Sequence, residues 1–239
     1  MTKTCIILAG GMGTRLQSVV NDRPKVMAEI EGKPFLSCLL DILLRQGIKN
    51  VVLAVGYKRE FIVNYYNYKY KDIELKYSIE DAPLGTGGAI RQALDYAEDE
   101  NVFIVNGDTY FDVDYKGMSD FHDKNNAQIT IALKELLDFD RYGSIQIANN
   151  RIVDFIEKKK ITQGLINGGV YLIRKNIFNG FSLTETFSFE IDFLQKYFTK
   201  MVCYGYISTG EFIDIGIPED YSLAKEVLYE WQQSSFFRS

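Results

Sequence analysis

Short runs of apolar, often β-branched residues alternate with amphipathic stretches through the first half of the chain. Each run is short enough for a buried strand, and the amphipathic stretches repeat their apolar positions at helical spacing. The predicted strands cover residues 4–10, 50–57, 73–80 and 101–108, and the predicted helices cover residues 35–47, 58–68 and 86–100. Strands separated by helices form βαβ units with right-handed crossovers, so we expect a Rossmann-like α/β fold with a mixed, mostly parallel sheet flanked by helices.

The second half of the chain is less regular and richer in strands. Its predicted strands cover residues 127–136, 143–150, 151–158, 165–174, 201–208 and 212–216, and its predicted helices cover residues 188–200 and 218–233. Pro218 stands at the start of the last helix, where its missing N–H costs nothing. We find no internal repeat, low-complexity tract or linker, so residues 1–239 are predicted to form a single domain.

Composition excludes several classes of protein. The chain has 239 residues and a formal net charge of −5, which argues against a broad basic surface for nucleic acid. Its three cysteines are scattered and apolar in context, which favours reduced, buried thiols. The one histidine, His122, is expected at the surface near a helix end and rules out a histidine-rich zinc site. We see neither a signal peptide nor a membrane-length apolar run, so we expect a soluble cytoplasmic protein.

A glycine-rich loop, "LAGGMGTRLQSVVNDRPK", follows the first predicted strand and ends at Lys25. Ligands of open α/β folds bind at the carboxyl edge of the sheet, where this loop must lie. Glycine lets backbone N–H groups approach phosphates, and Arg15 and Lys25 add positive charge. Leu16 excludes the G-x-G-x-x-G fingerprint, and no Walker A motif is present. The alternative is a glycine-rich turn without a ligand.

A second glycine cluster, "PLGTGGAI", would let a base or ribose lie against the backbone at Gly85, Gly87 and Gly88. The alternative is that it is only the start of a helix at Gly87. Two carboxylates, Asp108 and Asp214, follow or interrupt apolar strand residues. Buried carboxylates are costly unless they are paired or bound to metal, and hard oxygen ligands suit Mg²⁺. These two residues are therefore our candidate magnesium ligands, with turn or capping roles as the alternative.

Taken together, these motifs resemble those of the sugar-1-phosphate nucleotidylyltransferases. "GGMGTRL" with "RPK" matches the most specific signature of the family, and "LGTGGA", "NGD", "YG", "FIEK", "NGGVY" and "DIGIPEDY" follow in the family's order, from Ile6 to about Leu223. The resemblance implies a fold of the nucleotide-diphospho-sugar transferase type. It also implies a division of labour: residues 1–115 mainly bind the nucleotide, residues 116–223 mainly bind the sugar phosphate, and residues 224–239 form a C-terminal helix and tail.

The resemblance further assigns roles to single residues. Arg15, Lys25 and Asp108 would be catalytic, and Asp108 and Asp214 would hold Mg²⁺. The nucleotide-binding residues would be Leu8, Ala9, Gly10, Gly11, Met12, Gly13, Thr14, Glu80, Gly85, Thr86, Gly88, Asn106 and Gly107. The sugar-binding residues would be Tyr142, Gly143, Glu157, Lys158, Asn167 and Gly169.

The span "SVVNDRPKVM", with Ser18 in place of a common proline, is similar to the branch of the family that makes GDP-activated D-glycero-D-manno-heptose. GTP and a heptose 1-phosphate are therefore the expected partners, with no nucleic acid or membrane, and with monomer and homodimer both open. The alternatives are a uridylyl-, thymidylyl- or guanylyltransferase for a hexose 1-phosphate, a glycosyltransferase that uses the "DVD" string at Asp112–Asp114, and a non-enzymatic sugar-nucleotide-binding regulator.

Overall fold

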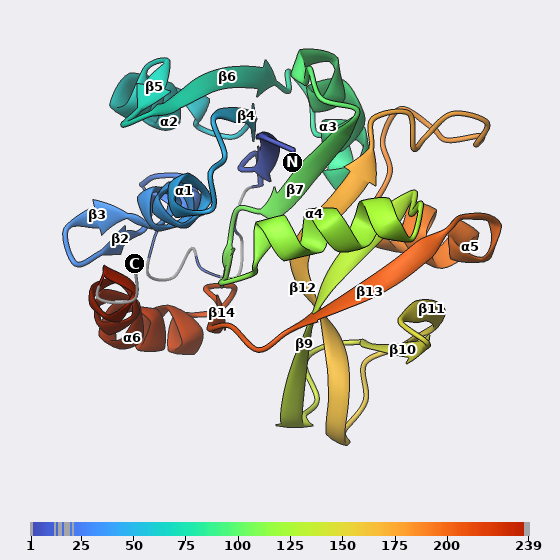
Figure 1. Ribbon diagram of the computed structural model, residues 1–239. Coiled ribbons are helices and arrows are strands. Elements are labelled where there is room, and N and C mark those ends of the chain that lie inside the picture. The colour runs from blue at the N-terminus through green and yellow to red at the C-terminus, as the bar shows by residue number, and fades with distance from the viewer. Residues whose placement is uncertain (1, 12, 14–15, 17–19, 21, 237–239) are drawn as a thin grey trace.

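The computed structural model describes residues 2–11, 13, 16, 20 and 22–236, and a ten-stranded mixed sheet forms its centre (Figure 1). The strand order is β10-β11-β13-β9-β12-β7-β1-β4-β6-β5. The strands are β1 (Thr4–Leu8), β4 (Asn50–Val55), β5 (Lys69–Tyr70), β6 (Ile73–Ile79), β7 (Asn101–Asn106), β9 (Ile129–Phe139), β10 (Ser144–Ala148), β11 (Arg151–Ile156), β12 (Ile161–Arg174) and β13 (Cys203–Ser208). The predicted α/β fold class is confirmed; the division of the chain into functional regions stays a prediction.

Two small sheets lie beside the large one. They pair β2 (Glu29–Ile30) with β3 (Lys33–Pro34), and β8 (Thr109–Phe111) with β14 (Phe212–Asp214). The helices are α1 (Phe35–Arg45), α2 (Arg59–Tyr66), α3 (Gly85–Ala93), α4 (Tyr115–Lys124), α5 (Gln195–Tyr197) and α6 (Pro218–Phe236). No helix among these residues is both long enough and apolar enough to cross a bilayer.

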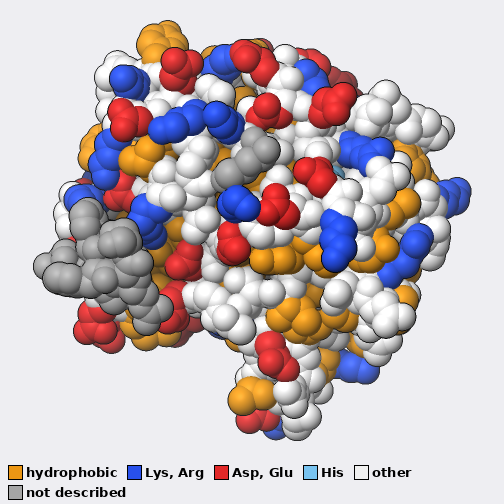
Figure 2. Space-filling model, viewed as in Figure 1, with side chains coloured by type: hydrophobic (Ala, Val, Ile, Leu, Met, Phe, Trp, Pro, Cys, Tyr) orange, Lys and Arg blue, Asp and Glu red, His pale blue; other side chains and the backbone are white. Residues whose placement is uncertain are grey.

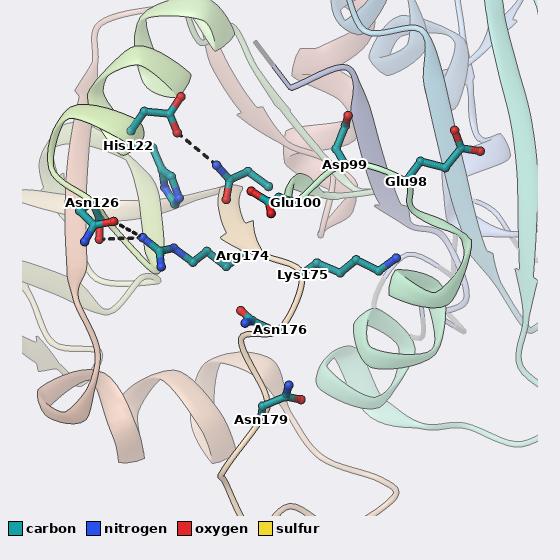
Figure 3. Close-up of a pocket in the computed structure, with 11 residues that line it drawn as sticks. Glu98, Asp99, Glu100, His122, Asn126, Arg174, Lys175, Asn176 and Asn179 are labelled. Atoms are coloured by element: carbon teal, nitrogen blue, oxygen red, sulfur yellow. Dashed lines mark hydrogen bonds between the residues drawn. The ribbon is translucent and has the colours of Figure 1, made fainter.

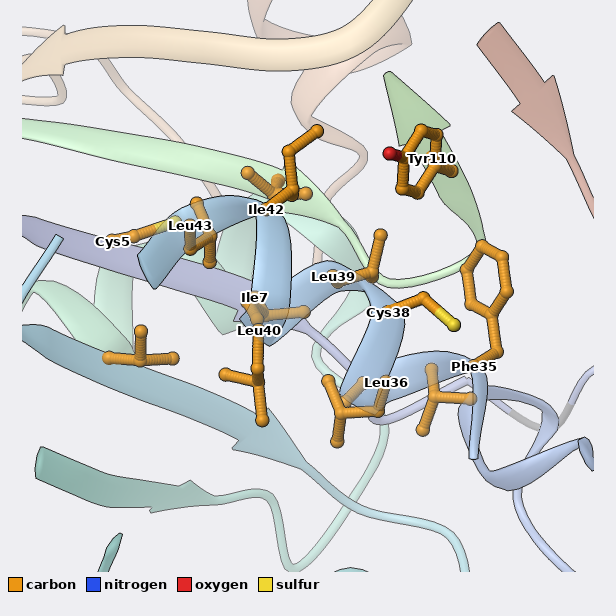
Figure 4. Close-up of a cluster of buried hydrophobic side chains, with 14 of the residues drawn as sticks. Cys5, Ile7, Phe35, Leu36, Cys38, Leu39, Leu40, Ile42, Leu43 and Tyr110 are labelled. Carbon is orange, nitrogen blue, oxygen red and sulfur yellow. The ribbon is translucent and has the colours of Figure 1, made fainter. Parts of the chain in front are cut away.

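Parallel pairing is concentrated in the first half of the chain. β7, β1, β4 and β6 pair in parallel. β1, β4 and β7 are apolar runs that can be buried on both faces, whereas β6 alternates apolar and polar residues and is only partly buried. Alternation along β1 sends Cys5 and Ile7 to one core and Ile6 to the other. The first core packs α1, α2, α4 and α6 on one face of the sheet, and Figure 4 shows the α1 side chains that fill it. The second core packs α3 and the 189–200 segment on the other face.

The second half departs from the predicted bounds. β9 and β12 run further than expected and pair from Ile129 with Ile173 to Phe139 with Ile161, forming the arm that extends away from the body in Figure 1. The predicted helix over residues 188–200 is present as three short pieces: a wide π-type turn over Phe189–Leu194, α5, and a 3₁₀ helix over Phe198–Lys200. Phe189 and Phe193 are buried there, so packing of aromatic rings accompanies the irregular backbone.

The expectation that His122 lies at the surface is wrong. His122 is 1% exposed, because it falls on the inward face of α4 together with Tyr115, Met118 and Ser119 at helical spacing. Its Nδ1 atom lies 2.8 Å from the Thr130 hydroxyl oxygen on β9. The neighbouring "DVD" string contains the cap of the same helix, since the Asp114 carboxylate accepts a hydrogen bond from the Gly117 N–H at 2.9 Å.

Charged side chains of both signs are mixed over the face seen in Figure 2. Lysine and arginine are interspersed with aspartate and glutamate, so the described part of this face carries no broad basic stretch. This agrees with the net charge of −5.

Candidate active site

The two predicted metal-binding carboxylates come from distant parts of the chain and lie beside each other. Asp108 follows the end of β7, and Asp214 is the last residue of β14. β14 pairs with β8 so that Asp214 is opposite Thr109, and the Ile215 N–H donates to the Asp108 carbonyl oxygen at 2.9 Å. Burial raises the pKa of the Asp214 carboxyl, and the charge of Asp108 raises it further. Two neighbouring carboxylates in a partly buried site repel each other, so a cation beside them would stabilise their charged forms.

Lys25 supplies one such cation. Its Nζ donates to the Asp108 carboxylate at 2.7 Å, and its side chain is only 10% exposed. It begins a 3₁₀ helix over Lys25–Met27 that follows Pro24. Gly13 lies directly against it: a Cβ at Gly13 would be 2.8 Å from the Lys25 Cβ, and the φ of Gly13 is +58°. A glycine at this position therefore lets the loop close over the lysine.

The donor set also suits a hard divalent cation. The described residues contain no group of three or more histidine, cysteine, aspartate or glutamate side chains arranged for a metal. Magnesium is commonly held by one or two carboxylates, with substrate phosphates and water completing its octahedron. Asp108 and Asp214 fit that pattern, so the pair would hold Mg²⁺ only together with a phosphorylated substrate.

The glycine-rich loop begins where β1 ends, next to the end of β7. Leu8 pairs with Asn106, and the Gly107 N–H donates to the Leu8 carbonyl oxygen at 3.0 Å. The Ala9 N–H donates to Ala54 on β4 at 2.8 Å, and Gly10 accepts from the Tyr57 N–H at 3.3 Å. Gly11 is exposed. Met12, Thr14 and Arg15 lie outside the described residues, so their predicted contacts with a triphosphate stay predictions.

Glu80 stands at the other side of this loop. Its carboxylate accepts from the Leu84 N–H at 3.2 Å, and an added Cβ at Gly10 would lie 2.5 Å from its second oxygen. Burial raises the pKa of this carboxyl. Glu80 thus places a hydrogen-bond acceptor next to the glycine-rich loop, where it could accept from an N–H group of a purine base.

The second glycine cluster packs against a distant segment. The Gly87 N–H donates to the Phe187 carbonyl oxygen at 2.9 Å, and the Thr86 hydroxyl accepts from the Phe189 N–H at 2.9 Å. The sides of Gly85 and Gly88 where a Cβ would stand also face this 185–187 backbone. The missing side chains thus serve helix packing, a reason that the sequence did not reveal, and contact with a base stays a prediction for Gly85, Thr86 and Gly88.

A hydrogen-bonded network forms on the predicted sugar side. The Asn167 amide donates to the Tyr171 hydroxyl at 2.8 Å and to the Glu190 carboxylate at 3.2 Å, and its oxygen accepts from the Gly169 N–H at 3.0 Å. The Tyr171 hydroxyl also donates to Glu190 at 2.7 Å. The pairing of β12 with β9 shifts register between Asn167 and Tyr171, which turns this stretch toward Asn106.

Glu190 is a candidate site residue that sequence reasoning missed. It is exposed, it touches the predicted Asn167, and it belongs to the 188–200 segment rather than to any matched motif. A single glutamate in "SFEIDF" looks like the polar face of a helix, so only the contact with Asn167 identifies it.

The remaining predicted sugar-side residues lie on two adjoining loops. Tyr142 is half-buried against the Phe212 ring, at a centroid distance of 6.2 Å, and its pKa rises to about 12 through burial and then the charge of Asp214. Gly143 passes against the Ile156 carbonyl oxygen at the end of β11. Glu157 and Lys158 follow that strand and are exposed. Tyr142 therefore lies near the carboxylates of Asp108 and Asp214. Glu157 and Lys158 lie at the protein surface.

Comparison with known proteins identifies the family to which this chain belongs. The family model described as "Nucleotidyl transferase" matches residues 4–230. The chain belongs to the nucleotidyl transferase family. This confirms the resemblance drawn from the glycine-rich signature and the motifs that follow it in order.

Within this nucleotidyl transferase family, the chain is 49% identical to a D-glycero-alpha-D-manno-heptose 1-phosphate guanylyltransferase of Aneurinibacillus thermoaerophilus, over 95% of this chain and 98% of that protein. It is 48% identical to the protein of the same name from Campylobacter jejuni, over 90% and 96% of the two chains. The crystal structure of HddC from Yersinia pseudotuberculosis complexed with GMP-PN superposes with a TM-score of 0.83 at 40% identity, covering 95% and 99% of the two chains.

Proposed function

We propose that this nucleotidyl transferase moves a guanylyl group from GTP to D-glycero-α-D-manno-heptose 1-phosphate, giving GDP-heptose and pyrophosphate. The observation that carries the proposal is the 49% identity, over nearly the whole of both chains, to a guanylyltransferase named for that sugar phosphate. The complex of HddC with GMP-PN supports a guanine nucleotide. We also propose that the enzyme works in the cytoplasm and supplies surface polysaccharide synthesis, such as capsule or lipopolysaccharide.

The reaction is an in-line displacement at the α-phosphorus. A phosphate oxygen of the sugar 1-phosphate forms the new bond, and the bond from the α-phosphorus to the bridging oxygen breaks, releasing pyrophosphate. Lys25 sits against Asp108 and would neutralise charge on the α-phosphate and on the attacking phosphate. Arg15 would stabilise the departing pyrophosphate.

Asp108 and Asp214 would hold Mg²⁺, which when bound supplies charge neutralisation at the phosphate oxygens. The remaining residues act by positioning. Glu80 would accept from the N1–H or the amino group of guanine, and an unpaired Glu80 would penalise a base without those donors. Asn167 and Glu190 belong to the hydrogen-bonded network that would bind the sugar hydroxyls.

A substrate matrix tests the proposal. Four nucleoside triphosphates are combined with the 1-phosphates of heptose, mannose, glucose and N-acetylmuramic acid, and pyrophosphate release is measured. We expect GTP with heptose 1-phosphate to give the highest kcat/KM, with mannose 1-phosphate used less efficiently. Preferred use of UTP or dTTP would overturn the guanylyl assignment. Release of a nucleoside diphosphate in place of pyrophosphate would indicate a glycosyltransferase, and an inert matrix would favour a binding regulator.

A further inference from the structure

A cavity lies at the opposite edge of the central sheet from Asp108. Its volume is about 760 Å³, within the usual range for small-molecule sites. It opens at Asn101, which begins β7, and at Arg174, which ends β12 and pairs with Asn101. Asp108 follows the far end of β7, so roughly 16 Å of strand, at ~3.3 Å per residue, separates the cavity from the candidate active site.

One buried atom faces this cavity without a partner. His122 lines the cavity and is 1% exposed, and Nε2 is the buried side-chain atom that has no hydrogen-bond partner among the described residues. Its other ring nitrogen is engaged with Thr130. Burial lowers the pKa of His122 to about 4, so the ring is neutral near pH 7. An unsatisfied buried nitrogen costs free energy, which a ligand hydroxyl would recover.

The polar groups around His122 are held in place by their own hydrogen bonds. The Arg174 guanidinium donates to the carbonyl oxygens of Ala127 at 2.9 Å and Asn126 at 3.1 Å. The Asn101 amide donates to the Asp123 carboxylate at 3.1 Å. Figure 3 shows His122 projecting from α4 toward Arg174, with Asn176 and Glu100 at the same opening.

Two further groups at this opening are available to a ligand. Both residues are exposed, and the Glu100 carboxylate and the Asn176 amide have no partner among the residues that the structure describes. Together with His122 they offer carboxylate, amide and imidazole groups, which accept and donate at short range from one another.

The charges of the lining decide the class of ligand. Acidic side chains outnumber basic ones: Glu98, Asp99, Glu100 and Asp123 against Arg174 and Lys175. That balance disfavours phosphates and nucleotides. A metal ion is also disfavoured, because three of these carboxylates already have partners: Glu98 bonds to Lys76, Asp99 to the N–H groups of Lys3 and Thr4, and Asp123 to Asn101. Hydroxyl groups both donate and accept, so they match a mixed lining of this kind. We propose that this cavity is a second binding site, separate from the reaction centre, for a neutral sugar or polyol.

The single histidine makes the test direct. His122 is the only histidine of the sequence, so in an untagged protein with isotope-labelled histidine the ring nitrogen signals belong to this residue alone. D-mannose is the probe, and the Nε2 chemical shift is followed by NMR during its titration. We expect a saturable shift. No shift up to the solubility of the sugar would mean that Nε2 binds water only, and would overturn the proposal.

Variants separate binding in the cavity from indirect effects. Asn176→Ala and Glu100→Ala each remove one exposed polar group from the lining and should raise the dissociation constant of the sugar about fivefold, the effect of one lost hydrogen bond. Asn64→Ala, at an exposed position on α2, is the matched control and should leave it unchanged. Equal affinity in all three variants would overturn the site. A saturable shift with inorganic phosphate or Ca²⁺, but not with mannose, would overturn the class of ligand.

Discussion

Lys25 donates to Asp108 across 2.7 Å although only 10% of its own side chain is exposed. A positive charge held in place in this way is suited to stabilising the transition state rather than to binding the substrate in its ground state. We expect Lys25→Ala to lower kcat by a factor of about 10²–10³, the loss of roughly 3–4 kcal/mol of electrostatic stabilisation, with a smaller change in KM. Steady-state pyrophosphate release measures both. Lys33→Ala, at an exposed lysine on β3, is the control, and a raised KM with intact kcat would make Lys25 a ground-state binder.

His122 gives the protein a predictable response to acid. Its pKa falls from 6.5 to about 4 in the folded chain, chiefly through burial. Between these values the unfolded chain binds more protons, so the free energy of unfolding should decrease as the pH falls from 6.5 toward 4, by up to about 3 kcal/mol. Urea unfolding at a series of pH values measures this. His122→Gln should be less stable at neutral pH but should lose that part of the pH dependence; an unchanged slope in the variant would contradict the assignment.

At the scale of elements, the 188–200 segment joins α3 to the sugar-side network. Glu190 accepts from both Asn167 and Tyr171, so it stands where sugar hydroxyls would be read. We expect Glu190→Gln to raise the KM for the sugar 1-phosphate about tenfold, through loss of a hydrogen bond to a charged group, and to leave the KM for GTP unchanged. Glu226→Gln on the exposed part of α6 is the control. Equal changes in both KM values would place Glu190 outside the sugar site.

The close packing of α3 against Phe187 can be tested by adding a side-chain methyl group to α3. A Cβ on Gly87 would lie 2.1 Å from the Phe187 ring, whereas one on Gly11 would meet nothing within 4 Å. Gly87→Ala should therefore lower the free energy of unfolding by about 1–3 kcal/mol through overpacking, and Gly11→Ala should leave it nearly unchanged. Thermal unfolding compares the two. Equal stability of both variants would mean that the segment carrying Phe187 can move away freely.

The same elements show what the sequence could and could not predict. Apolar runs long enough to be buried identified β1, β4 and β7, because burial on both faces leaves a local pattern. The sequence of β6 instead alternates apolar and polar residues, which is also a local pattern. The irregular turns over residues 189–200 and the full length of β12 depend on distant partners, Phe178 and Phe139 among them, which no local pattern contains. For the same reason Asn167 was predicted from its motif while its neighbour Glu190 was not.

Across the whole molecule, the candidate metal site is shared between the two halves of the chain. Asp108 and Asp214 were predicted separately from their apolar flanks, but their meeting depends on the pairing of β8 with β14. His122 was misjudged because a short helix in a polar stretch did not reveal which face turns inward. Placement at one sheet edge is thus predictable from topology, whereas the register of distant strands and the buried face of a short polar helix are not.

The shared site leads to a prediction about additivity. If both carboxylates hold one Mg²⁺, Asp108→Asn and Asp214→Asn should each lower kcat by orders of magnitude, and the double variant should be little worse than either single one. Circular dichroism should show an intact fold in all three. Pyrophosphate release over a range of Mg²⁺ concentrations measures the effect. Multiplying losses would indicate separate roles, and fully active, folded single variants would remove the metal assignment.

The pairing of β8 with β14 also determines when the enzyme becomes active during its synthesis on the ribosome. A nascent chain can complete β1, β4, β6 and β7, together with the glycine-rich loop and Lys25, while Asp214 has not yet been synthesised. Such a chain could hold a nucleotide pocket but would lack half of its carboxylate pair. Activity would therefore begin only after translation has passed β14, so prematurely terminated products would not turn over GTP.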